Sequence, residues 1–119
     1  MAFTTHFTNP EPPRADVDGW QGTAVIEFGT PWCGFCLRAQ PLIASAFERH
    51  PNLHHVKVED GPGRPLGRSF RVKLWPTLIL LRDGQEVERL VRPASAEELA
   101  EALHRLVQPS AAQPPIAPK

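Results

Sequence analysis

The chain has 119 residues, 41% of them hydrophobic, which is enough for one domain with its own apolar core. Its 13 basic and 13 acidic residues cancel and are scattered, which argues against an electrostatic nucleic-acid binder. The longest apolar run, residues 77–81, is too short to span a bilayer, and residues 1–9 lack the layout of a secretory signal. We therefore expect a cytoplasmic protein of a reducing compartment, without nucleic-acid or membrane partners.

Prolines divide the chain into three expected parts. A Pro-rich N-terminal segment covers residues 1–18, and the domain itself covers residues 19–108. Four prolines in residues 109–119 leave few backbone donors for regular structure, so we expect a mobile tail there.

Between these ends, apolar periodicity predicts alternating strands and helices. In chain order they are a strand at 23–28, a helix at about 33–49, a strand at 53–58, a short helix near 66–70, two strands at 77–82 and 86–91, and a final helix. Asp83-Gly84 favours a tight hairpin turn between the last two strands. Ser95 and Glu98 are spaced as a capping box at the start of the final helix. This order predicts an α/β fold whose mixed sheet is parallel in its first half, antiparallel in its second, and covered by helices on both faces.

The two cysteines, Cys33 and Cys36, occur in Trp32-Cys33-Gly34-Phe35-Cys36, just after the first predicted strand. Both sulfurs then share the first turn of the following helix, where the positive end of the helix dipole favours a thiolate. The spacing therefore predicts a dithiol for redox exchange.

Two structural interpretations of the cysteine pair are less favoured. A zinc site needs two more ligands, and His54 and His55 are adjacent, so on a strand they point to opposite faces. We accordingly expect no metal. A structural disulfide would close a loop too short to restrain the unfolded chain much.

The order of elements and the motifs together resemble the thioredoxin family over about residues 23–107. The likeness rests on Glu27-Phe28 at the end of a strand, the Trp-Cys-Gly-x-Cys motif, Pro41 five residues past the second cysteine, and Pro76-Thr77 opening the next long strand. The N-terminal stretch matches in length only, with room for a short strand at 3–7 and a turn of helix before Trp20. The resemblance implies a thioredoxin fold.

It also implies roles for the reacting groups. Cys33 would be the exposed nucleophile that forms a mixed disulfide with the substrate, and Cys36, one turn deeper, would resolve it. Glu27 occupies the place of a family aspartate that helps remove the proton from the resolving thiol. Lys57 matches a lysine near that carboxylate. The alternative for both charges is a strand edge in solvent.

The resemblance further implies a cis peptide bond before Pro76, facing the cysteines, with the backbone of Trp75 presented to a bound peptide; an ordinary proline at a strand start is the alternative. Phe35 stands where the family commonly has proline, Gly29 where it has tryptophan, Leu74 where it has a small residue, and Arg92 where it has glycine. The expected substrate surface is bulkier than usual and one charge more basic, and Gly34 leaves the sulfur accessible. Its residues are Trp32, Gly34, Phe35, Trp75, Pro76 and Arg92.

Three functions remain open from the sequence. The favoured one is a monomeric reductase of protein disulfides, regenerated by a separate donor of the thioredoxin-reductase type, since the chain has no flavin or nicotinamide fingerprint and we expect no cofactor. The second is a disulfide oxidant or isomerase, which the missing proline between the cysteines supports. The third is a protein-binding module anchored by Trp32, Phe35 and Trp75.

Overall fold

The computed structural model describes residues 4–108, and the expected tail at 109–119 lies outside this range. Four strands form one sheet in the order β2-β1-β3-β4. They are β1 (Thr23–Gly29), β2 (His54–Glu59), β3 (Thr77–Arg82) and β4 (Gln85–Val91). β1 pairs parallel with β2 and antiparallel with β3, and β3 pairs antiparallel with β4. The predicted mixed sheet is confirmed.

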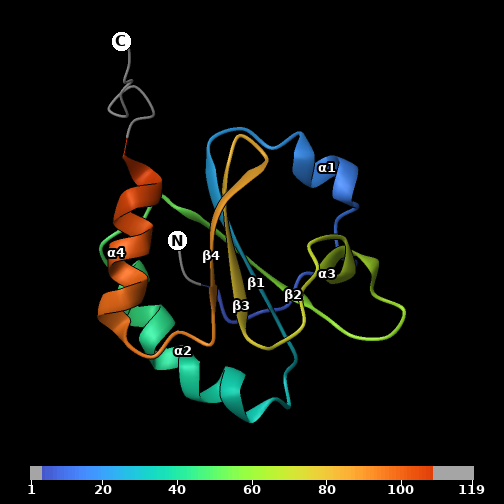
Figure 1. The fold of residues 1–119 in the computed structure, drawn as a ribbon, viewed down its shortest axis with the longest axis horizontal. Helices are drawn as coiled ribbons and strands as arrows, with labels where there is room; N and C mark the ends of the chain where they lie inside the picture. Colours follow the sequence, from blue (N-terminus) through green and yellow to red (C-terminus); the bar gives the residue numbers. More distant parts are fainter. Residues whose placement is uncertain (1–3, 109–119) are drawn as a thin grey trace.

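Helices cover both faces of this sheet, as Figure 1 shows. The long helices α2 (Gly34–Phe47) and α4 (Ala96–Val107) lie on one face, and the short helices α1 (Arg14–Asp18) and α3 (Pro65–Ser69) lie on the other. Each face has its own apolar core. Val25, Leu78 and Leu80 pack under α2 and α4. Ile26, Phe28 and Ile79 pack with residues of α1 and α3.

The strand alternation decides which polar side chains lie under α2. Glu27 is two residues from Val25, so it points to the same face of β1 as that core residue. The parallel register pairs Val25 with His55 and Glu27 with Lys57, which places all three polar side chains on this face. Sheet pairing therefore brings together charges that are far apart in the sequence.

The turn signal and the Ser95 N-cap are confirmed, while the Glu98 side chain of the expected capping box bonds the amide before the N-cap. Asp83 and Gly84 have φ values of 52° and 79°, as a two-residue type I′ hairpin turn requires. A Cβ at Gly84 would lie 2.2 Å from the carbonyl oxygen of Asp18, so only glycine fits there. At the start of α4, Ser95 Oγ accepts a hydrogen bond from the Glu98 amide at 3.1 Å, and Glu98 Oε1 accepts one from the Ala94 amide at 2.9 Å.

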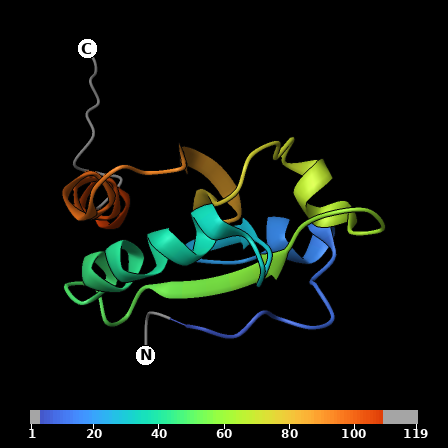
Figure 2. The ribbon, with the colours of Figure 1, turned by 90° about the horizontal axis from the view of Figure 1, so that it is seen from below.

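The N-terminal segment runs beside the free edge of β2, as Figure 2 shows. In the described part, from residue 4 onward, the expected strand is reduced to one parallel bridge between Phe7 and Lys57. The Thr8 amide donates to the Lys57 carbonyl at 2.7 Å, and the Leu66 amide donates to Glu11 Oε2 at 2.9 Å. The expected turn of helix before Trp20 is α1. None of the helices within residues 4–108 is both long and apolar enough to cross a bilayer.

Candidate active site

Cys33 is the N-cap residue of α2, and Cys36 lies in the first turn of that helix. Cys33 Sγ accepts a hydrogen bond from the Cys36 amide at 3.3 Å. Both residues are free thiols, with 7% and 5% of their surfaces exposed. The expectation of an exposed Cys33 is therefore wrong in degree. As an N-cap, its side chain turns back toward the amide groups of the first turn instead of projecting into solvent.

The surroundings push the pKa values of the two thiols apart. Burial alone would raise the pKa of Cys33, but a hydrogen bond with the Cys36 thiol, hydrogen bonds from the amides of Cys36 and Phe35, and the charge of Arg92 together lower it below its ordinary value. Burial, the hydrogen bond with Cys33 and the charges of Cys33 and Glu27 raise the pKa of Cys36 to about 12. At neutral pH, Cys33 is thus the more acidic thiol and Cys36 holds its proton.

Gly29, at the end of β1, makes room for the deeper sulfur. A Cβ at this position would lie only 2.5 Å from Cys36 Sγ. Because glycine stands where the family usually has tryptophan, the end of β1 can lie directly against the Cys36 thiol.

Glu27 is buried, with 2% of its surface exposed, so the interpretation as a solvent-exposed strand charge is wrong. Both of its carboxylate oxygens have partners. His55 Nε2 lies 2.9 Å from Oε1, and Gln40 Nε2 donates to Oε2 at 2.7 Å. Lys57 Nζ lies 3.9 Å from Oε2 and donates to Gln40 Oε1 at 3.1 Å. Gln40 thus bridges the expected Glu27–Lys57 pair.

The contact at Nδ1 assigns the tautomer of the neutral His55 ring. The Thr4 amide lies 3.0 Å from His55 Nδ1, and an amide can only donate, so Nδ1 is the acceptor. In the neutral ring the proton is then on Nε2, which donates to Glu27. The ring also stacks on Phe47, with centroids 4.6 Å apart.

Sequence reasoning missed Gln40 and His55 as parts of the site. His55 alternates with Lys57 on its strand, so the two side chains share a face. Only the parallel register with β1, however, shows that Glu27 lies on that face too. For Gln40, the position one turn after Cys36 on the same helix face was the only signal. Its Nε2 also donates to the Cys36 carbonyl at 3.2 Å, which fixes the amide beside the cysteine turn.

The peptide bond between Trp75 and Pro76 is cis, as the resemblance implied. The indole Nε1 of Trp75 donates to Asp60 Oδ2 at 2.9 Å, and its ring meets that of Trp32 edge-on, with centroids 5.7 Å apart. The Trp75 backbone was expected to face a bound peptide, and its carbonyl already accepts a hydrogen bond from Arg92 Nε at 2.9 Å.

Large side chains surround this end of the molecule. Trp32 is 70% exposed and Phe35 is 47% exposed. Arg92, at a φ of 49°, places its guanidinium carbon 3.7 Å from the centroid of the Phe35 ring. The structure thus brings Phe35, Trp75 and Arg92 together, while the binding roles of these residues remain predictions.

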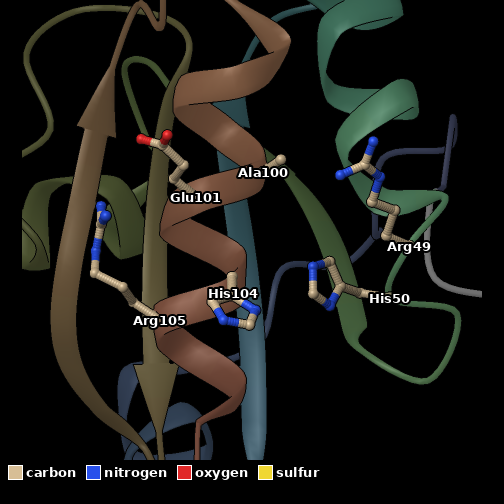
Figure 3. A pocket seen from close by; sticks show the side chains of 6 residues that line it. All are labelled: Arg49, His50, Ala100, Glu101, His104 and Arg105. Atoms are coloured by element: carbon tan, nitrogen blue, oxygen red, sulfur yellow. The ribbon is translucent and has the colours of Figure 1, made fainter.

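A hollow of about 490 Å³ lies at the opposite end of α2 from the cysteines. Figure 3 shows the rings of His50 and His104 turned toward the space between α4 and the end of α2, whereas Arg105 points to the other side of α4. Burial, then the charges of His104 and Arg49, lower the pKa of His50. Within residues 4–108 no group of three or more His, Cys, Asp or Glu side chains could hold a metal ion, here or elsewhere. This hollow contains no thiol, so the candidate site remains the cysteine end of α2.

Comparisons with known proteins agree with this geometry. A family model described as Thioredoxin matches residues 6–105. The structure of thioredoxin 2 from Pseudomonas aeruginosa in its reduced form is 54% identical, with a TM-score of 0.80 over 88% of this chain and 97% of that chain. Protein disulfide-isomerase A2 from Pongo abelii is 37% identical over 93 residues, which are 73% of this chain but 18% of that protein.

Thioredoxin-2 from Pyricularia oryzae is 32% identical over 82 residues, or 67% of this chain. The chain spans about half of that relative, 48% of its length. Thioredoxins are thiol–disulfide oxidoreductases, and Cys33 and Cys36 are spaced as a redox-active dithiol. With its fold, its cysteine pair and a family match over most of its length, the chain belongs to the thioredoxin family.

Proposed function

We propose that this protein reduces protein disulfides through Cys33 and Cys36. The observation that carries the proposal is the place of Cys33 at the N-cap of α2, where its Sγ accepts a hydrogen bond from the Cys36 amide. Hydrogen bonds there lower the pKa of Cys33, whereas burial raises the pKa of Cys36. A thiolate is the nucleophile in thiol–disulfide exchange, so the thiol with the lowered pKa attacks and the other waits in protonated form.

In the first step, the Cys33 thiolate attacks one sulfur of the substrate disulfide. A bond forms between Cys33 and that sulfur, the substrate disulfide breaks, and the departing thiolate takes a proton from solvent. In the second step, Cys36 gives up its proton and attacks Cys33 Sγ, and the second substrate thiolate departs. Two electrons pass to the substrate, and the protein is left with a Cys33–Cys36 disulfide.

The first step prepares the second. While both thiols are free, the hydrogen bond with Cys33 and the charge of Cys33 are among the causes that raise the pKa of Cys36. Both causes disappear once Cys33 is part of a mixed disulfide, so Cys36 becomes more acidic when it is needed. Glu27, whose charge also acts on Cys36, is the proposed proton acceptor, and Lys57 supports it.

The surface around the cysteines is the proposed substrate contact. It comprises Trp32, Gly34, Phe35, Trp75, Pro76 and Arg92, of which the exposed aromatic rings offer an apolar area for a peptide. Thioredoxins reduce disulfide substrates and receive their electrons from thioredoxin reductase. For this chain we propose regeneration by a donor of that type, action as a monomer, and a reducing compartment such as the cytoplasm, where the oxidised pair can be returned to the dithiol.

The test compares the wild-type protein with Cys33→Ser and Cys36→Ser, using a disulfide-bonded protein substrate and dithiothreitol as electron donor. The wild type should accelerate reduction, and both variants should lose the acceleration. In a parallel reaction of the pre-reduced protein without dithiothreitol, Cys36→Ser should accumulate a covalent adduct with the substrate, because the resolving thiol is missing, and added dithiothreitol should then release it. Full activity of Cys36→Ser would contradict the proposed mechanism.

Phe35 between the cysteines and the likeness to a protein disulfide-isomerase favour a second candidate, an oxidant or isomerase. The reduction potential distinguishes the two. Equilibration with glutathione should give a reduction potential of about −270 mV for a reductase and of about −180 mV for an isomerase. A reduction potential close to the isomerase value would favour the second candidate over the reductase proposal.

A further inference from the structure

Two arginine side chains lie over the exposed ring of Phe35. The guanidinium carbon of Arg92 is 3.7 Å from the ring centroid, and that of Arg38 is 4.8 Å from it. A hollow of about 200 Å³ adjoins them, which we call the Phe35 pocket. Its lining residues are Phe35, Arg38, Ala39, Leu42, Pro76, Arg92 and Pro93.

Within residues 4–108, no carboxylate pairs with the two arginines of the Phe35 pocket. Four other arginines each pair with a carboxylate, namely Arg14, Arg64, Arg89 and Arg105. Among residues 4–108, neither Arg38 nor Arg92 forms such an ion pair, and the pocket lining contains no acidic residue. The chain has as many acidic as basic residues, so carboxylates are available elsewhere but none is placed here.

Hydrogen bonds hold the Arg92 side chain while part of its guanidinium group stays available for a ligand. Arg92 donates from Nε to the Trp75 carbonyl, and its amide donates to the Pro76 carbonyl at 2.9 Å. Its Nη groups donate to no other residue in the described part of the chain. The base of the side chain is thus held in place while its outer N–H groups remain available. A guanidinium group presents paired N–H donors that match the two oxygens of a carboxylate.

The Phe35 pocket is also next to the reacting sulfur. Pro76 lines the pocket and follows the cis bond, and the charge of Arg92 acts on the Cys33 thiolate. Residues beside a substrate cysteine that has reached Cys33 are therefore close enough to contact the Phe35 ring.

We propose that the Phe35 pocket binds an acidic side chain, Asp or Glu, of the substrate protein beside its attacked cysteine. The carboxylate lies between the Arg38 and Arg92 guanidinium groups, and its methylene groups pack on Phe35. The preferred substrates are accordingly disulfides flanked by an acidic residue. This inference rests on the proposed reductase function and narrows it to a substrate class.

The test uses disulfide-linked peptides of one fixed sequence, with Glu or Gln at each position within four residues of the attacked cysteine. A further pair carries the same exchange far from the cysteine, as a control for overall charge. The wild type should reduce the best-placed Glu peptide with a kcat/KM about five- to twentyfold above its Gln counterpart, and the ratio should fall at high salt. The remote exchange should give a ratio near one.

Variants assign this preference to the pocket. Arg38→Gln and Arg92→Gln should each reduce the Glu-to-Gln ratio, and the double variant should bring it close to one. The ratio is the right quantity because Arg92 also acts on Cys33, and a changed thiol affects both peptides alike. Arg49→Gln, at the far end of α2, is the matched control and should keep the wild-type ratio.

The outcomes separate this inference from the function on which it rests. If the wild type reduces no peptide, the reductase proposal fails. If it reduces Glu and Gln peptides equally at every position, or if the double variant keeps the preference, the acidic-substrate inference is wrong and the reductase function stands.

Discussion

The buried carboxylate of Glu27 can be tested by replacing it with an amide of the same shape. In the structure, both oxygens accept hydrogen bonds, from His55 Nε2 and from Gln40 Nε2. Glu27→Gln leaves one accepting oxygen and introduces two N–H donors. One of the two contacts then becomes N–H against N–H.

The neighbours cannot rearrange to remove this conflict. Turning the Gln40 amide would place its N–H groups against Lys57 Nζ and its oxygen against the Cys36 carbonyl. Moving the His55 proton to Nδ1 would place it against the Thr4 amide. The exchange therefore leaves a buried donor without an acceptor, whichever arrangement is chosen.

The magnitude follows from two losses and one gain. An unsatisfied buried donor costs about 1–3 kcal/mol. Lys57 also loses the opposite charge 3.9 Å away, although it keeps Gln40 and the Phe7 ring. The gain is that a buried charge no longer has to be desolvated. Together we expect Glu27→Gln to lower the free energy of unfolding by about 2–4 kcal/mol.

The assay is equilibrium unfolding of the reduced protein in urea at pH 7. Glu88→Gln, which removes an exposed ion pair with Arg105, serves as control and should cost less than about 1 kcal/mol. In a Lys57→Met background the cost of Glu27→Gln should shrink, because no ammonium is left without its partner. A Glu27→Gln protein as stable as the wild type would refute the assigned hydrogen-bond directions.

Three further predictions follow from the same contacts. Thr4→Pro removes the amide that donates to His55 Nδ1, whereas Thr4→Ala keeps it. Ring ¹⁵N shifts at pH 7 should show the Nε2–H tautomer in the wild type and in Thr4→Ala, and a mixture of both tautomers in Thr4→Pro. An Nδ1–H ring in the wild type would contradict this assignment. Gly67→Ala would place a Cβ 2.2 Å from Asp60 Oδ1. Thermal unfolding should show a stability lower by about 1–3 kcal/mol, despite the better helix propensity of alanine. Unchanged stability would be evidence against the tight packing. The pKa of Cys36 is raised from an ordinary 9.0 to about 12, so between these pH values the folded reduced protein keeps a proton that the unfolded chain releases. The free energy of unfolding should therefore fall more steeply from pH 9 toward 12 in the wild type than in Cys36→Ser. Parallel pH curves for the two proteins would contradict the shift.

The elements of the fold could be predicted because each has a local signal. The strand at 77–82 is found with those bounds, and the helix predicted at about 33–49 is Gly34–Phe47. Apolar runs, the Asp83-Gly84 turn and the capping box depend on neighbouring residues only, so no knowledge of tertiary contacts is needed to recognise them.

The surroundings of the cysteines could be predicted only in part, because they depend on long-range pairing. His55 reaches Glu27 through the parallel register of β1 and β2, and Gln40 reaches it through the packing of α2 on the sheet. Arg38 is one of several scattered cations in the sequence, and only the folded chain shows it beside Arg92 over the Phe35 ring.

The most direct test of the account is the pH dependence of alkylation at each cysteine of the reduced protein, measured by mass spectrometry of the cleaved chain. Cys33 should be labelled at pH 7, with a midpoint below the ordinary thiol value, because amides, the Cys36 thiol and Arg92 stabilise its thiolate. While Cys33 is still free, Cys36 should be labelled far more slowly, because its raised pKa of about 12 keeps its thiol protonated. Equal labelling rates at pH 7, or faster labelling of Cys36, would contradict the assignment of nucleophile and resolving thiol.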